Sequence, residues 1–258
     1  REVKITPEIM SKYWNDTIKY MEEPRYNWNL PMYYFTNKFL SNNNIVVTMS
    51  GDMGDELYDG YSNYYRIKNL SNKPKTWEEF LKLWMKKFAA PIKLNIKFDY
   101  EDLFELLKQS LPQEIWNPDD IANSAMALDC ITVVPEDFFS RNDKFGMAFS
   151  MEGRFPLASK TYMKYCLGIN SDYKFGNKLK ERKLPVKLSY EKNLPNYILE
   201  KDKTGWSVPL TVWLSQFEII KKKYIETCTK EDGITQILSK ENYTGNLKRI
   251  IITWMLRT

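Results

Sequence analysis

Two helices are predicted in the first forty residues, because their apolar positions recur at intervals of three and four. The first begins at Thr6-Pro7-Glu8, which combines a capping side chain, a proline at the first helical position and an acid in the first turn. It ends at Glu22-Glu23-Pro24, and the second helix covers residues 31–40. The apolar positions of the two helices are Met10, Tyr13, Trp14, Ile18, Met32, Phe35 and Phe39.

A strand and a glycine loop follow. Residues 45–48 read IVVT, a β-branched run that predicts a buried strand. After it, residues 50–61 read SGDMGDELYDGY, and a helix is expected to begin near Asp55, with Leu57, Tyr58 and Tyr61 at helical spacing. Helix, strand and loop together predict an α/β unit, in which ligands bind at the carboxyl ends of strands.

The loop at residues 50–56 has the composition of a phosphate site that also holds a cation. N–H groups in a glycine loop and at a helix N-terminus attract phosphate. Three carboxylates would repel a bare phosphate, so we interpret Asp55 as a ligand of Mg²⁺ that bridges to the phosphate oxygens. The alternative is an acidic turn that only caps the helix, and the pattern leaves it open.

From Lys68 onward the pattern is helical. Thr76 and Glu79 are spaced as a capping box. The stripe that follows is interpreted as core and not as a cofactor pocket, and it consists of Trp77, Phe80, Leu81, Trp84 and Phe88. Further helices are expected near residues 103–107, 212–217 and 247–254. Because no linker or repeat interrupts the pattern, we expect residues 1–258 to form one domain.

The composition of the 258 residues, 43% hydrophobic and 15% aromatic, is that of a packed globular chain. The net charge of +5 suits anionic substrates without arguing for nucleic acid. No histidine is present, which excludes histidine-based nucleophile pairs and histidine metal sites. Three scattered cysteines and no membrane-length apolar stretch predict a reduced, cytoplasmic location. Because the first residue is Arg1, we expect a piece of a longer protein.

Two sets of charged residues are interpreted as structural. Glu152 and Arg154 stand among apolar residues, so we expect them to form an internal ion pair that fixes the helix after them. Lys174, Lys178 and Lys180 are interpreted as a solvated surface.

Lys203 is the candidate catalytic cation. Gly205 allows close backbone approach, and Trp206 and Val208 would exclude water around it. A lysine in such a setting can neutralise charge that develops on a transferring phosphate. Binding of a nucleic-acid backbone by this basic segment is a competing idea, but the interleaved aromatic residues of a stacking platform are missing.

Three stretches of the sequence resemble the asparagine synthetase family. SGDMGDELYDGY is similar to the signature Ser-Gly-(Glu/Asp/Gly)-Gly-(Ala/Ser)-Asp-Glu-(Leu/Val)-Phe-Gly-Gly-Tyr, with departures at Met53, Gly54 and Asp59. Residues 128–156 resemble the family's Asp…Leu-Pro…Asp-Arg-x-Ser-Met-Ala run and its Glu-x-Arg-x-Pro. Residues 183–209 resemble its Lys…Leu-Arg…Leu-Pro…Arg-x-Lys-x-Gly-Phe-x-x-Pro.

The resemblance implies an α/β, mostly helical fold. This would be the distal part of an ATP-pyrophosphatase parallel-sheet domain, related to adenine nucleotide alpha-hydrolases, with a helical C-terminal region. It also implies that ATP adenylates the side chain of aspartate and that ammonia from glutamine then gives asparagine, AMP and pyrophosphate.

The residue roles that the resemblance implies cluster at the loop. It places Ser50, Gly51, Asp55 and Glu56 at ATP and Mg²⁺, with Asp55 as the metal ligand. It places Asp52 next to the acyl-adenylate and Lys203 at the transition-state charge. Asp52 is one methylene shorter than the Glu common in the family, and a displacement of about 1 Å matters at such a position.

Part of the family pattern is missing. The sequence contains no Ser-Gly-Gly-x-Asp-Ser loop and no amino-terminal cysteine. We therefore expect this chain alone to be inactive, with a glutaminase domain and the loop in a longer protein, and a homodimer is compatible with the family. The alternatives are a β-lactam-forming or peptide-cyclising relative that adenylates another carboxylate, and a non-catalytic module that retains the fold.

Overall fold

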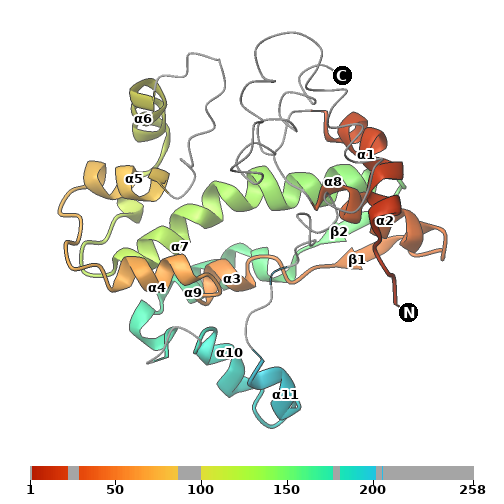
Figure 1. The fold of residues 1–258 in the computed structure, drawn as a ribbon. Helices are drawn as coiled ribbons and strands as arrows, with labels where there is room; N and C mark the ends of the chain where they lie inside the picture. Colours follow the sequence, from red (N-terminus) through yellow and green to blue (C-terminus); the bar gives the residue numbers. More distant parts are fainter. Residues whose placement is uncertain (1, 23–28, 87–99, 177–180, 202–204, 206–258) are drawn as a thin grey trace, which may run out of the picture.

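The computed structural model describes residues 2–22, 29–86, 100–176, 181–201 and 205. In this part the chain is mostly helical with a small parallel sheet, which is consistent with the α/β prediction (Figure 1). Several predicted features lie outside the described residues. These are Phe88, Lys178, Lys180, Lys203 and the expected helices at 212–217 and 247–254.

The first two helices are confirmed. α1 spans Pro7–Met21 and α2 spans Leu30–Ser41. The hydroxyl of Thr6 accepts a hydrogen bond from the N–H of Ile9 at 3.4 Å, which is the cap that the sequence predicted. The two helices pack on each other and on α8 through an aromatic cluster that includes Tyr34 and Phe145.

The sheet consists of β1, Val47–Met49, and β2, Glu152–Arg154, paired in parallel with Thr48 opposite Gly153. The prediction of a buried strand at 45–48 is wrong in its burial, because Ile45 is 40% and Val46 is 65% exposed. The β-branched run correctly indicated extended backbone. Strand propensity describes fit to a pleated surface, and it does not determine which face another layer covers.

A helical crossover connects the two strands (Figure 1). Its elements are α3 (Gly54–Leu57), α4 (Ser62–Lys68), α5 (Trp77–Lys86), α6 (Tyr100–Ser110), η1 (Gln113–Ile115), α7 (Ile121–Ile131), the π-helical turn η2 (Val134–Phe139) and α8 (Ser140–Met147). After β2 follow η3 (Pro156–Ala158), α9 (Lys160–Gly168), η4 (Ser171–Tyr173), α10 (Leu184–Ser189) and α11 (Asn196–Leu199). A parallel pair requires such a crossover.

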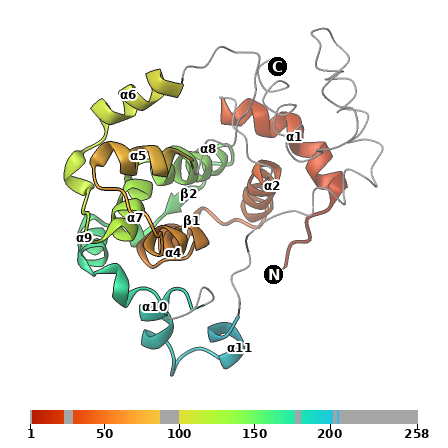
Figure 2. The same ribbon diagram turned by 60° about the vertical axis from the view of Figure 1, so that its left-hand side comes forward.

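The main core lies among the crossover helices, where α4, α5 and α7 meet (Figure 2). The predicted stripe is confirmed as core for its described members, Trp77, Phe80, Leu81 and Trp84, which are 0–5% exposed. The Thr76 cap of the predicted capping box forms, because Thr76 Oγ1 accepts from the N–H of Glu79. The Glu79 carboxylate accepts from the N–H of Lys75, one residue before the cap, and not from that of Thr76.

Candidate active site

The loop between β1 and α3 begins where the strand pairing ends. The Ser50 N–H donates to the carbonyl of Arg154 at 3.0 Å, next to the last strand pair. The N–H of Asp52 donates to Ser50 Oγ at 3.3 Å, and that of Gly54 donates to the carbonyl of Gly51 at 3.2 Å. The loop is therefore held by bonds of its own at the carboxyl end of a parallel strand, where the sequence predicted a ligand site.

The helix after the loop is shorter than predicted. α3 ends at Leu57, so Tyr58 and Tyr61 do not continue it. The chain turns instead at Asp59, whose φ is 55°, and the N–H of Gly60 donates to the carbonyl of Asp55 at 2.7 Å. Aspartate tolerates this left-handed backbone better than most residues do. A four-residue helix contributes little dipole, so anion binding here would depend mainly on the loop N–H groups and on side chains.

Met53 departs from the glycine of the family signature and occupies a left-handed position. Its φ is 75°, a backbone conformation that favours glycine. Its side chain is 1% exposed and packs with Leu57 and Tyr58 in the interior. Burial of this methionine offsets the backbone cost and fixes the loop on the helical core.

Lys183 approaches Asp55 from a distant part of the chain. The ammonium lies 2.9 Å from Asp55 Oδ1, with the two side chains 36% and 22% exposed. The Lys183 N–H donates to the carbonyl of Tyr58, and Arg182 Nη1 donates to the carbonyl of Gly60 at 3.2 Å. Segment 181–184 is therefore hydrogen-bonded to the turn at residues 58–60. It also places the Lys183 ammonium beside Asp55, the predicted metal ligand.

Gly60 makes room for the Asp55 carboxylate. A Cβ atom at position 60 would lie 1.6 Å from Asp55 Oδ1 and 2.3 Å from its Cγ. At Gly51, in contrast, no atom lies within 4 Å of an added Cβ. The glycine at position 60 is thus required by the close approach of one functional side chain.

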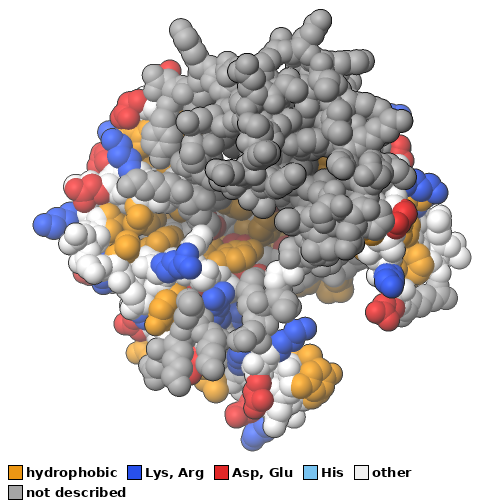
Figure 3. Space-filling model, in the orientation of Figure 1, with side chains coloured by type: hydrophobic (Ala, Val, Ile, Leu, Met, Phe, Trp, Pro, Cys, Tyr) orange, Lys and Arg blue, Asp and Glu red, His pale blue; other side chains and the backbone are white. Residues whose placement is uncertain are grey.

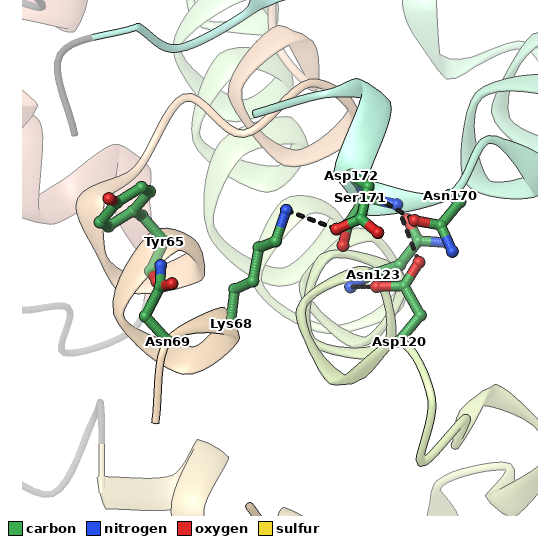
Figure 4. A network of polar contacts seen from close by, with 8 residues as sticks. All are labelled: Tyr65, Lys68, Asn69, Asp120, Asn123, Asn170, Ser171 and Asp172. Carbon is green, nitrogen blue, oxygen red and sulfur yellow. Dashed lines mark hydrogen bonds and ion pairs between the residues drawn. The ribbon is translucent and has the colours of Figure 1, made fainter. Parts of the chain in front are cut away.

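The base of the Lys183 segment is anchored by a polar network between α4, the start of α7 and η4 (Figure 4). Lys68 pairs with Asp172 at 2.6 Å, and Asp120 Oδ2 accepts from the N–H of Ser171 at 2.8 Å. The N–H of Asn123 donates to Asp120 Oδ1 at 3.1 Å. These bonds fix the chain just before the residues that lead to Lys183.

Lys174 is not a solvated lysine, so that prediction is wrong. Its side chain is fully buried, and its ammonium donates to Asn123 Oδ1 at 2.7 Å. Burial lowers the pKa of Lys174 to about 8, although nearby Asp120 opposes the shift. Sequence composition alone did not reveal this, because the network that accepts the lysine is assembled from three separate elements.

A side chain of α8 holds Asp52. Asn142 Nδ2 donates to Asp52 Oδ2 at 2.6 Å. One residue earlier, Arg141 is 4% exposed and bonds both carboxylate oxygens of Asp137 at 3.0 Å. Its guanidinium also lies over the ring of Tyr33, 4.3 Å from the centroid, and donates to the Tyr33 hydroxyl at 3.2 Å. The start of α8 therefore borders the loop with a fixed set of polar side chains.

Glu56 and Asp59 point into the interior. Glu56 is 2% exposed, and its burial raises the pKa of the carboxyl to about 7, while a hydrogen bond with Tyr61 opposes the rise. Asp59 is 1% exposed, neither of its oxygens has a hydrogen-bond partner, and burial raises its pKa to about 8. Both carboxyls lie behind the loop, and a ligand at the Asp55 side would not reach them.

Glu152 and Arg154 do pair, but on the surface. The Arg154 Nε lies 2.9 Å from Glu152 Oε1, and the two side chains are 59% and 62% exposed. The prediction of an internal ion pair is therefore wrong. The two residues alternate with Gly153 along β2, so both side chains stand on the same exposed face of the strand.

Ser50, Gly51 and Asp52 lie on the loop after β1, and Asp55 lies in the first turn of α3. Their roles in binding and catalysis stay predictions. Lys203 lies outside the described residues, and its predicted approach to Asp55 stays a prediction. Sequence reasoning missed Lys183 and Asn142 as neighbours of the loop. Each belongs to a segment that resembles the family, but no local pattern indicates which loop it contacts.

No group of three or more histidine, cysteine, aspartate or glutamate side chains among the described residues could hold a metal ion. Among the helices that the structure describes, none has the length and apolar character needed to cross a membrane.

Comparison with known proteins adds one match. The family model described as asparagine synthase matches residues 1–243 of this chain. A search of curated proteins found no match.

Proposed function

This chain belongs to the asparagine synthase family, and on that premise we propose that it carries part of the active site that converts aspartate to asparagine. Family membership supports an ATP-dependent, amide-forming ligase. In the proposed reaction ATP adenylates the side-chain carboxylate of aspartate. Ammonia from glutamine then displaces AMP, and pyrophosphate is the other product.

The ion pair between Lys183 and Asp55 carries the proposal. It places a cation and a carboxylate side by side, both partly exposed, on the loop that follows β1. Magnesium pyrophosphate needs this combination, because a carboxylate suits the metal and an ammonium suits the phosphate oxygens. Mg²⁺ usually takes one or two carboxylates and completes its shell with phosphate and water, so Asp55 alone fits it as a protein ligand.

Each loop residue has a role in this proposal. Asp55 would hold Mg²⁺, which when bound neutralises phosphate charge, while Lys183 binds and orients the phosphates. Ser50 and the N–H of Gly51 would contact the nucleotide, and Asp52 would face the acyl group. Lys203 is proposed to offset charge that develops in adenylation. The buried position of Glu56 favours support of the loop over contact with ATP.

Two alternatives differ in their support. The departures at Met53 and Asp59 favour a non-catalytic module, because both place side chains where the family signature has glycine. Ring closure by a relative would use a tyrosine–glutamate base. The described residues contain one such hydrogen bond, between Tyr61 and Glu56, but this carboxylate is 2% exposed and would not reach a substrate. We therefore retain the module as the second candidate.

Calorimetric titration of the chain with Mg-ATP and with Mg-pyrophosphate tests the proposal. We expect both to bind, Asp55→Ala to weaken binding at least about tenfold, and Lys183→Ala to weaken Mg-pyrophosphate most. Asp119→Ala and Lys164→Ala remove the same charges at exposed positions elsewhere and should leave binding unchanged. Absence of binding in every protein would favour the non-catalytic module.

A second measurement addresses turnover. The chain incubated with Mg-ATP, aspartate and ammonium should form no AMP above the background, because the pyrophosphatase loop that the resemblance implies is absent from its sequence. In the proposal this loop and the glutaminase belong to the longer protein. Steady formation of AMP by the chain alone would contradict this expectation.

A further inference from the structure

Asp52 is held by a side chain that is ninety positions away in the sequence. Asn142 Nδ2 donates to its carboxylate across 2.6 Å. The distance is short for an N–H···O bond, as expected when the acceptor is charged. Both side chains are half-buried, so the bond lies at the rim of the loop and not in the core.

The position of Asn142 depends on the π-helical turn before α8. Such a turn contains an extra residue, which rotates the following side chains by about 100° around the helix axis. After η2, Arg141 is directed to Asp137 and Tyr33, and Asn142 is directed to the loop. Because Arg141 is 4% exposed and bonded on two sides, the first turn of α8 is fixed, and Asn142 is fixed with it.

An asparagine suits a positioning role at this site. Its amide donates to a carboxylate without adding charge, so it restrains the Asp52 side chain and leaves the net charge of the loop unchanged. Aspartate has only one methylene between its backbone and its carboxyl group, so a small rotation moves the oxygens away from a substrate. A restraint that keeps one rotamer therefore improves alignment with the acyl group.

We propose that Asn142 is a positioning residue that fixes the Asp52 carboxylate toward the acyl-adenylate. This inference rests on the proposed function, because it assumes that Asp52 faces the acyl group. It assigns Asn142 no contact with ATP phosphates, which are held on the Asp55 and Lys183 side of the loop.

The test compares two ligands of the whole chain. One is Mg-ATP, and the other is a stable sulfamoyl analogue of β-aspartyl-adenylate. Asn142→Ala should weaken the analogue about tenfold and leave Mg-ATP within about twofold. Asn142→Asp should weaken the analogue further, because it places two carboxylates against each other. Asn69→Ala removes the exposed asparagine that follows α4 and should change neither affinity.

Rescue separates positioning from a merely structural role. In the Asn142→Ala background, Asp52→Glu lengthens the acid by one methylene and should recover most of the lost affinity. In an Asp52→Ala background, Asn142→Ala should have no further effect, as required when one residue acts through the other. Should Asn142→Ala fail to fold, Asn142→Leu, which keeps a similar side-chain size but removes the donor, takes its place.

The outcomes distinguish the two proposals. If Mg-ATP binds but the affinity for the analogue is the same in the Asn142→Ala variant, the positioning role is refuted and the proposed function stands. If Asn142→Ala weakens both ligands equally, or if Asp52→Glu gives no rescue, Asn142 only supports the fold. If neither ligand binds any of the proteins, the proposed function fails and this inference fails with it.

Discussion

Around the loop, the positions of single side chains depend on the available space and on charge more than on helices or strands. The Asp55 carboxylate occupies the volume that a side chain at position 60 would need. Behind it, Asp59 and Glu56 are buried carboxyls with raised pKa values. Such groups stabilise the fold only in the protonation state that burial favours, so their effect depends on pH.

Replacement of Gly60 tests the close approach. Gly60→Ala would place a methyl group 1.6 Å from Asp55 Oδ1, so the carboxylate must move. We expect a loss of about 1–3 kcal/mol in the free energy of unfolding, measured by urea denaturation. Gly51→Ala introduces the same methyl group where no atom lies within 4 Å, and should cost less than about 0.5 kcal/mol apart from backbone effects. Equal losses at the two positions would contradict the crowding argument.

The buried carboxyls predict that stability falls as pH rises. The folded chain raises the pKa of Glu56 to about 7 and of Asp59 to about 8, so it binds these protons more tightly than the unfolded chain. Their contribution is complete below the ordinary carboxyl pKa and is lost as pH rises through 7 and 8. The sequence has no histidine to complicate this window. We expect the free energy of unfolding to fall by several kcal/mol between pH 5 and 8, because each such carboxyl contributes about 1.4 kcal/mol per pH unit below its folded pKa.

A variant identifies the source of this pH dependence. Asp59→Asn removes one titrating group and should flatten the decline, whereas Asp119→Asn, at an exposed position, should not. Lys174 affects stability in a different pH range. Its pKa is lowered to about 8 in the folded chain, so it makes the free energy of unfolding rise with pH only between 8 and its ordinary pKa near 10.5. A decline that is unchanged in Asp59→Asn would exclude Asp59 as its cause.

At the scale of elements, one buried carboxylate joins three helices. Asp129 of α7 accepts from the hydroxyl of Tyr64 in α4 at 2.5 Å and from the indole N–H of Trp84 in α5 at 2.7 Å. All three side chains are 0–5% exposed. Because α4 directly follows the turn at Gly60, the contacts of Asp129 with Tyr64 and Trp84 also support the candidate site.

Removal of that carboxylate should loosen the junction. Asp129→Ala leaves two buried donors without their acceptor and should cost about 2–4 kcal/mol, measured as the free energy of unfolding. Asp129→Asn keeps the shape and one acceptor oxygen, so its cost should be smaller. A cost below about 0.5 kcal/mol for Asp129→Ala would contradict the proposed role.

At the scale of the whole molecule, the core lies with the helices and not with the sheet. The side chains of β1 are largely exposed, as are Leu188, Tyr190 and Tyr197 around α10 and α11. In the space-filling view, the end of the molecule that carries α10 and α11 mixes hydrophobic and charged side chains of both signs (Figure 3). The described sheet therefore positions the loop and contributes little buried area.

This arrangement predicts a contrast between two apolar positions close in sequence. Met49 is 73% exposed, so Met49→Thr should change the free energy of unfolding by less than about 0.5 kcal/mol. Leu57 is fully buried, so Leu57→Ala should cost about 2–5 kcal/mol. Thermal or urea unfolding of the two variants provides the measurement. A large cost for Met49→Thr would show that the strand face is covered.

The sequence by itself determined the local features. It predicted α1 with its Thr6 cap, the Thr76 cap and the core stripe of α5, because these depend on neighbours within one or two helical turns. It also predicted the glycine loop after a strand. It did not predict the early end of α3, although Asp59-Gly60 was the available signal.

Tertiary structure alone decided which distant groups meet. It brought Lys183 to Asp55 and Asn142 to Asp52, buried Lys174, and left β1 and the Glu152–Arg154 pair exposed. Residue types record how a side chain can interact, but burial and pairing depend on which segments pack together after the crossover is complete. For that reason the loop could be predicted from the sequence, and its cation and its positioning amide could not.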